Sequence, residues 1–133
     1  MIMLRFHRSG DRPLEFEGEI LAAVNTAGTT RNEPAGRWYE CQIARTTGGQ
    51  YAVEVCYHTS WQDTEDDVDF AFYGDADEVL SWLQTFDPTA PVLGYPPGQQ
   101  FQARQQRLHD VIRARWTTAL TELLAVLPPE RIE

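Results

Sequence analysis

The sequence contains no lysine, so all eleven of its basic residues are arginines. This absence excludes the lysine of a phosphate-binding P-loop, a Schiff-base lysine and a lysine general base. No serine lies in a nucleophile-elbow context, and no Gly-rich phosphate or dinucleotide loop is present. The sequence therefore predicts no cofactor. Codon usage in a GC-rich bacterial genome accounts for the missing lysine, so we expect a bacterial protein.

Cysteines and long apolar runs are also scarce. The two cysteines lack the spacings of a disulfide framework or a zinc site, which is typical of proteins in a reducing compartment. No apolar run approaches the roughly 18 to 20 residues needed to span a bilayer, and the N-terminus lacks the features of a signal peptide. These absences predict a cytoplasmic protein without a membrane segment.

Basic residues are fewer than acidic ones, 11 against 20, so the formal net charge is −9. Binding to nucleic acid or to an anionic membrane relies on surplus cationic side chains, so unaided binding to either is not expected. At 133 residues, the chain is long enough for one domain, residues 1–133, with a single hydrophobic core.

The strongest local pattern is a β-hairpin at residues 37–61. Two runs rich in aromatic and β-branched residues, 38–44 and 51–57, flank a Thr-Thr-Gly-Gly-Gln segment. The register of the two strands decides which side chains share a face. A two-residue turn at the glycines would place Ile43 opposite Glu54 and mix apolar and charged groups on both faces.

A three-residue loop over residues 47–49 produces a different register. One glycine then adopts the left-handed conformation, Ile43 pairs with Val53, and one face is apolar throughout. We predict this register, because the other would put glutamates into the core. Cys41 and Cys56 then lie on opposite faces as free thiols. The polar face, which we expect to point toward water, carries Trp38, Glu40, Gln42, Glu54, Cys56 and His58.

Three further strands are predicted by alternation at residues 2–8, 14–24 and 68–74. The second is half-buried, and Gly18 marks a bulge or a bend in it. A polar loop follows at residues 25–36. The apolar side of the second strand carries Leu14, Phe16, Ile20 and Val24.

Two helices are predicted in the second half of the chain. A capping box formed by Asp75 and Glu78 begins the first, which ends at Phe86. A Pro-rich connector, residues 88–98, follows and should dock through Val92, Leu93 and Tyr95. The class is therefore α+β, with an antiparallel sheet of about five strands packed on one face by two helices, the C-terminal one long.

The long helical pattern covers residues 99–127. At 1.5 Å per residue it would reach roughly 42 Å, which is longer than a small sheet is wide. An overhanging apolar stripe needs cover, and a second copy of the chain would supply it. We therefore expect a homodimer through this helix, although a break in the helix would remove the need.

His58, Glu40, Glu54 and Cys56 are the candidate catalytic residues. A histidine beside a carboxylate can act as a general base, and a nearby cysteine can be a nucleophile. No oxyanion-forming loop or orienting third residue can be named, so a polar, solvent-facing sheet surface is the simpler interpretation. If these residues form a ligand or enzyme site, we expect a cleft between the sheet and the long helix.

The candidate metal ligands are the carboxylates of Asp63, Glu65, Asp67 and Asp69, since hard cations prefer oxygen ligands. The EF-hand pattern is absent, because Val68 stands where that loop needs glycine. A solvated acidic loop that protects a sheet edge from pairing is the simpler interpretation.

Arg104, Arg107, Arg113 and Arg115 form the only basic concentration, on the long helix. A solvated helix face that pairs with the acidic middle of the chain explains them most simply. They could also dock an acidic partner. A phosphate backbone is a third possibility, which the overall negative charge disfavours.

The surplus of negative charge without a catalytic signature favours a non-enzymatic protein-binding or assembly module, of the immunity or antitoxin type, with a basic protein partner. Electrostatic steering and burial of aromatic side chains would provide the affinity. The alternative is a small-ligand-binding protein or a small enzyme that uses the His58 group. The candidate binding residues are Trp38, His58, Trp61, Arg104 and Arg107.

Overall fold

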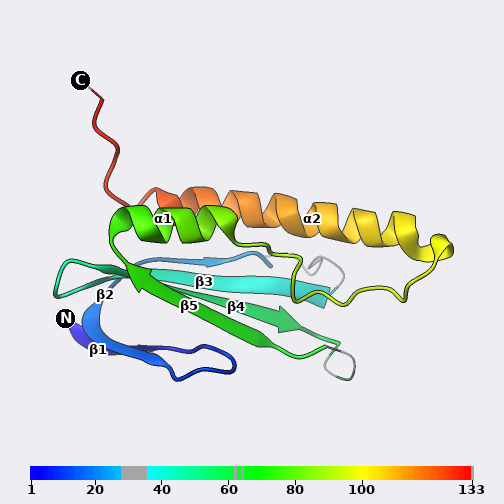
Figure 1. Cartoon of the computed structure of the whole chain (residues 1–133), viewed down its shortest axis with the longest axis horizontal. Coiled ribbons are helices and arrows are strands. Elements are labelled where there is room, and N and C mark those ends of the chain that lie inside the picture. The colour runs from blue at the N-terminus through cyan, green and yellow to red at the C-terminus, as the bar shows by residue number, and fades with distance from the viewer. Residues whose placement is uncertain (28–35, 62, 64, 133) are drawn as a thin grey trace.

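A computed structural model of the chain describes residues 1–27, 36–61, 63 and 65–132. Most of the loop predicted over residues 25–36 lies outside the described residues. Five antiparallel strands precede two helices, and strands adjacent in sequence are adjacent in the sheet, so the predicted α+β class is confirmed (Figure 1). The elements are β1 (Ile2–Phe6), β2 (Leu14–Asn25), β3 (Arg37–Thr46), β4 (Tyr51–Thr59), β5 (Val68–Gly74), α1 (Ala76–Thr85) and α2 (Gln99–Leu124).

The central hairpin of β3 and β4 has the predicted register. Ile43 lies opposite Val53, and the backbone N–H of Thr46 donates to the carbonyl of Gln50 at 2.9 Å, which leaves a three-residue loop. Gly49 occupies the left-handed position of that loop, with φ of +84°. The two cysteines are free thiols.

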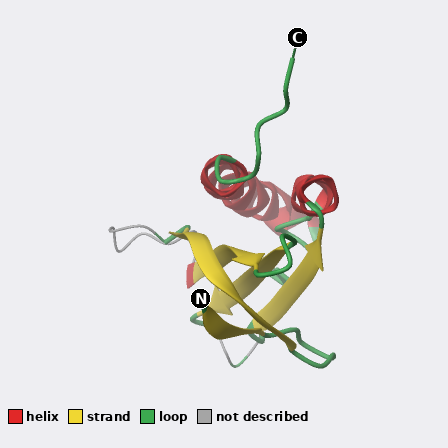
Figure 2. Ribbon diagram, turned by 90° about the vertical axis from the view of Figure 1, so that its left-hand side faces the viewer, coloured by secondary structure: helices red, strands yellow, loops and turns green. Residues whose placement is uncertain are grey.

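Both helices pack on the apolar face of the sheet, α1 over β4 and β5 and α2 over β2 and β3 (Figures 1 and 2). The capping box of Asp75 and Glu78 begins α1 as predicted. Each fully buried large apolar side chain contributes roughly 1.5 to 3 kcal/mol through the hydrophobic effect. The most deeply buried side chains between sheet and helices are Tyr39, Ile43, Val53, Val55, Tyr57, Val79, Leu83 and Leu123.

The sheet curls away from the helices, so its other face is concave (Figure 2). At one end of this face, Phe6 and Phe16 meet edge to face at 5.1 Å between ring centroids. They pack against Ala44 and Ala52, whose small side chains leave room for the rings. β1 and the first half of β2 thus cover part of the sheet face that the hairpin pattern predicted to be exposed to solvent.

A bulge at Leu21 changes the face that β2 presents. The pairing with β3 slips between Ile20 and Ala22, so Ala22 and Val24 face the helices although Ile20 faces the concave side. Ile20 stays on the concave side beyond the end of β1 and is exposed, so its predicted burial is wrong. Gly18 has a different role from the predicted bulge: a Cβ there would lie 2.4 Å from the carbonyl oxygen of Arg45.

α2 ends at Leu124, three residues earlier than predicted, and is about 39 Å long. Its first turns project beyond the sheet (Figure 1). Phe101 in this part stacks on Tyr95, with 6.2 Å between the ring centroids. From Leu108 onward, the apolar stripe is buried against the same chain.

The connector between the helices docks less completely than predicted. Val92 is buried as expected, whereas Leu93 is exposed, so the prediction for Leu93 is wrong. Among the described residues, no helix is both long enough and apolar enough to cross a membrane.

Candidate functional site

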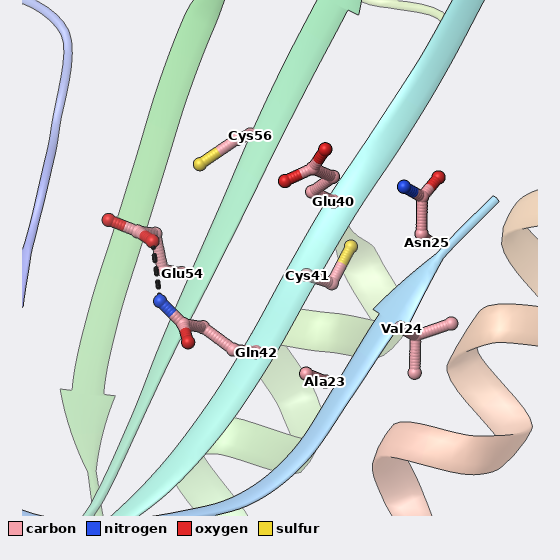
Figure 3. Close-up of a pocket in the computed structure, with 8 residues that line it drawn as sticks. All are labelled: Ala23, Val24, Asn25, Glu40, Cys41, Gln42, Glu54 and Cys56. Carbon is pink, nitrogen blue, oxygen red and sulfur yellow. Dashed lines mark hydrogen bonds between the residues drawn. The ribbon is translucent and has the colours of Figure 1, made fainter. Parts of the chain in front are cut away.

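The part of the concave face that β1 leaves uncovered contains a hollow of about 310 Å³ (Figure 3). Strands β3 and β4 supply most of its wall, and β2 supplies one side. Two carboxylates line the hollow, and none of the described residues in its wall is an arginine. The lining residues are Ala23, Val24, Asn25, Glu40, Cys41, Gln42, Glu54 and Cys56.

Glu54 is only 7% exposed, so the prediction that it points into water is wrong. Its face was predicted correctly, but the curl of the sheet brings the end of β1 over it. One carboxylate oxygen accepts a hydrogen bond from the backbone N–H of His7 at 2.5 Å. The other accepts from Gln42 Nε2 at 2.8 Å, the dashed line in Figure 3. These bonds compensate for the lost hydration of the carboxylate.

The environment of Cys56 does not suit a nucleophile. Burial, together with the nearby carboxylates of Glu54 and Asp69, raises the pKa of this thiol far above its ordinary value. On the other face, burial raises the pKa of Cys41 to about 12. Since the thiolate is the reactive form, both cysteines stay protonated at neutral pH. The predicted catalytic residues therefore lie on one face of the sheet as expected, but Cys56 among them is not an activated nucleophile.

His58 and Trp38 come together as the hairpin register predicts. Their rings stack at 5.4 Å between centroids with an interplanar angle of 27°. The imidazole Nδ1 lies 3.3 Å from Asp67 Oδ2, and Nε2 lies 3.8 Å from Glu40 Oε2. Asp67 is held in place because its Oδ1 accepts the backbone N–H of Thr59 at 3.1 Å. The side chains of His58, Trp38, Asp67 and Glu40 thus form one edge of the concave face.

The four candidate metal ligands do not gather at one point. Glu65, expected in a solvated loop, is instead buried and paired with Arg37 and Tyr57. Asp67 turns toward His58, while Asp63 is exposed. Within the described parts of the chain, no group of three or more His, Cys, Asp or Glu side chains is arranged to hold a metal ion.

The ion pair with Arg37 favours the charged form of the Glu65 carboxyl group. Burial would raise the pKa of this carboxyl, but hydrogen bonds from Arg37 and Tyr57 outweigh that effect and lower the pKa below its ordinary value. The backbone N–H of Gly94 also donates to Glu65, at 3.5 Å. Glu65 therefore ties the segment before β5 to both the hairpin and the connector between the helices.

The candidate binding residues fall on two sides of the molecule. Arg104 and Arg107 are exposed on α2, which packs on the face opposite the hollow. Arg113 pairs with Asp110 of the same helix at 3.8 Å rather than with the acidic middle of the chain. Trp61, just after the end of β4, is also exposed. The helix arginines therefore cannot act together with Trp38 and His58.

The predicted cleft between the sheet and the long helix does not contain the His58 group. Alternation along β3 and β4 places Glu40, Glu54, Cys56 and His58 on the concave face, away from both helices. Between sheet and α2, the crevice bordered by Thr26, Ile112, Arg115 and their neighbours has no room for a water molecule.

A second, wider hollow of about 710 Å³ lies between the β1–β2 turn and the β3–β4 turn. Its charged side chains are balanced, because two arginines, Arg8 and Arg12, line it together with two acidic residues, Asp11 and Glu15. The smaller hollow is therefore the more distinctive site. Sequence reasoning missed Asn25, which lines the hollow because the bulge in β2 changes the face of that strand, and His7, which the curl of the sheet brings to Glu54.

Comparisons with protein-family models, with curated proteins and with solved structures give no match. The candidate site consequently rests on its own geometry.

Proposed function

We propose that this protein is a non-enzymatic binding module that recognises a basic protein partner through the acidic concave face of its sheet. The observation that carries this proposal is the composition of the hollow, where Glu40 and Glu54 line the wall without an arginine among its described residues. We place the module in the cytoplasm of a bacterium, as an assembly protein of the immunity or antitoxin type.

The partner would insert a cationic side chain into the hollow. Glu40 is suited to receive it, because its side chain is 56% exposed and can turn toward an incoming guanidinium or ammonium group. Trp38 lies beside His58 and offers an aromatic surface, to which a cation is attracted by about 0.5 to 2 kcal/mol. The net charge of −9 steers a basic partner toward the protein over longer distances.

Calorimetry with a hexa-arginine peptide at low salt tests this function. We expect binding that weakens as salt is added, since exposed charges are screened within about 10 Å at 0.1 M salt. Glu40→Gln should lower the affinity about fivefold, which corresponds to roughly 1 kcal/mol for a half-exposed charge pair. Glu122→Gln is the matched control, because it removes an exposed carboxylate from α2.

Two results would contradict the proposal. One is the absence of any binding at low salt. The other is an equal loss of affinity in the Glu40 and Glu122 variants, which would show that only net charge matters. A host protein captured at low salt would support the proposal only if it is basic and is lost with Glu40→Gln.

A small cationic ligand is the second candidate for the same hollow. Its volume of about 310 Å³ matches the smallest ligand pockets, which begin at about 300 Å³. Free arginine distinguishes the two candidates, because tight binding of the amino acid alone would favour a ligand-binding protein. Displacement of hexa-arginine only at a large excess of free arginine would favour a protein partner.

We also propose a homodimer through α2. The helix extends beyond the sheet (Figure 1), and Val111 is exposed on it. Light scattering should give twice the chain mass of 15.2 kDa, and Val111→Glu should reduce it to the monomer value. A monomer mass for the wild-type protein at all concentrations would overturn this assembly.

A further inference from the structure

The hydrogen bond to Asp67 determines which nitrogen of His58 carries the proton. An ionised carboxylate only accepts hydrogen bonds, so the Nδ1 that lies 3.3 Å from Asp67 must be the donor. In the neutral ring, Nε2 is then an acceptor. This nitrogen is buried and has no hydrogen-bond partner among the described residues.

Nε2 of His58 faces another acceptor. The nearest charged atom is Glu40 Oε2 at 3.8 Å, and a carboxylate cannot donate to it. A proton added to Nε2 turns these two acceptors into a donor and an acceptor. Protonated His58 would then lie between two carboxylates, with Nδ1–H directed at Asp67 and Nε2–H directed at Glu40.

The other groups around His58 favour the same change. The Trp38 ring stacked on the imidazole attracts a cation. Asp69 of β5 lies opposite Cys56, next along the same face of the sheet. Further along, Glu54 has its own histidine, because His7 Nδ1 lies 3.5 Å from Glu54 Oε2. The carboxylates around His58 thus come from β3, β5 and the segment before β5, and the thiol of Cys56, two residues earlier on the same face of β4, stays protonated because burial raises its pKa.

We propose that His58 is a proton switch for the acidic hollow. When the imidazole is neutral, Glu40 is available to a cationic side chain. When it is protonated, His58 draws Glu40 toward Nε2 and neutralises negative charge that the partner needs. This inference rests on the proposed function and adds its regulation: a basic partner binds at neutral pH and is released in mildly acidic conditions.

The affinity of hexa-arginine as a function of pH tests the switch. Histidine is the side chain that changes charge between about pH 5 and pH 8, so binding should weaken between about pH 7.5 and about pH 5.5, by up to the roughly fivefold loss expected for Glu40→Gln. His58→Gln, which stays neutral, should remove most of this dependence. His109→Gln is the control for a histidine on α2, and His7→Gln measures the separate contribution of the histidine beside Glu54.

Each outcome has a distinct meaning. Binding that does not change with pH, or a pH dependence that persists in His58→Gln, overturns the switch and leaves the proposed function standing. A dependence lost in His7→Gln but kept in His58→Gln assigns the effect to the wrong histidine and also overturns it. Failure of hexa-arginine to bind at any pH overturns the proposed function and, with it, the switch.

A second measurement does not need the probe. Nitrogen-15 spectra of the histidine rings in the free wild-type protein report which ring nitrogen is protonated. The structure predicts the Nδ1–H form of neutral His58 above about pH 8, because Asp67 accepts from that nitrogen. An Nε2–H form would overturn the switch even if hexa-arginine binds.

Discussion

Arg37 and Glu65 form a buried ion pair between the first residue of β3 and the segment before β5. Their side chains are 8% and 1% exposed. The guanidinium Nε donates to both carboxylate oxygens, at 3.1 and 2.9 Å, and Nη2 donates to Oε2. The Tyr57 hydroxyl donates to Oε1 at 2.5 Å. Because Asp67 follows Glu65 by two residues, this pair also holds the carboxylate that orients His58.

Loss of the Glu65 charge should destabilise the protein strongly. Glu65→Gln leaves the Arg37 guanidinium buried without its counter-charge, which typically costs about 3 to 5 kcal/mol. The free energy of unfolding measured with urea should fall by that amount. Asp66→Asn removes an exposed neighbouring carboxylate and should change it by less than about 0.5 kcal/mol. Similar effects of the two variants would show that the ion pair is not important for stability.

The same carboxyl should make stability depend on pH in the acid range. Its pKa in the folded protein lies below the ordinary value of 4.5, so the folded state binds fewer protons than the unfolded chain. The resulting stabilisation is fully present above pH 4.5 and is lost as the pH falls through the folded-state pKa. Urea unfolding from about pH 7 to about pH 3 should therefore show the wild-type advantage over Glu65→Gln narrowing only at acidic pH. A constant difference across the range would contradict this.

The hairpin loop offers a matched pair of glycine substitutions. Gly49 has φ of +84° and no atom within 4 Å of an added Cβ, so Gly49→Ala tests backbone strain alone. We expect a loss of about 1 kcal/mol in the free energy of unfolding. Gly48 does not need a positive φ, and Gly48→Ala should be neutral or stabilising by up to about 1 kcal/mol. Equal effects of the two variants would contradict the three-residue loop.

Both thiols should react slowly with alkylating or disulfide reagents in the folded protein. Burial raises the pKa of Cys41 to about 12, and the pKa of Cys56 is raised further. Thiolate is therefore scarce at neutral pH. We expect rates on the order of a hundredfold or more below those of the urea-unfolded chain, in which each thiol returns to an ordinary pKa near 8.5. Rapid labelling of Cys56 in the folded state would reinstate it as a candidate nucleophile.

Several features of the site follow from local patterns in the sequence. Alternation in the two hairpin strands, together with the cost of burying glutamates, predicted that Trp38 faces His58 and that Glu40 faces Cys56, as observed. The capping box at Asp75 likewise predicted the start of α1.

Other features depend on contacts that no local pattern reveals. The sequence predicts that Glu65 belongs to a solvated acidic run. In the structure it is buried and paired with Arg37, which lies 28 residues earlier in the chain. The bulge at Leu21 reverses the face of β2 where the sequence shows only continuing apolar residues. Glu54 has the alternation of an outward residue, and it is buried because His7, 47 residues away, meets it across the curled sheet.

The sequence by itself determined the elements, the hairpin register and the set of side chains on each face of the hairpin, because alternation, capping and turn chemistry act between near neighbours. Only the tertiary structure decided which of those side chains are exposed to solvent, paired with another charge or buried. The curl of the sheet and the bulge in β2 bring distant segments together, and burial and electrostatic pairing depend on the distances between such segments.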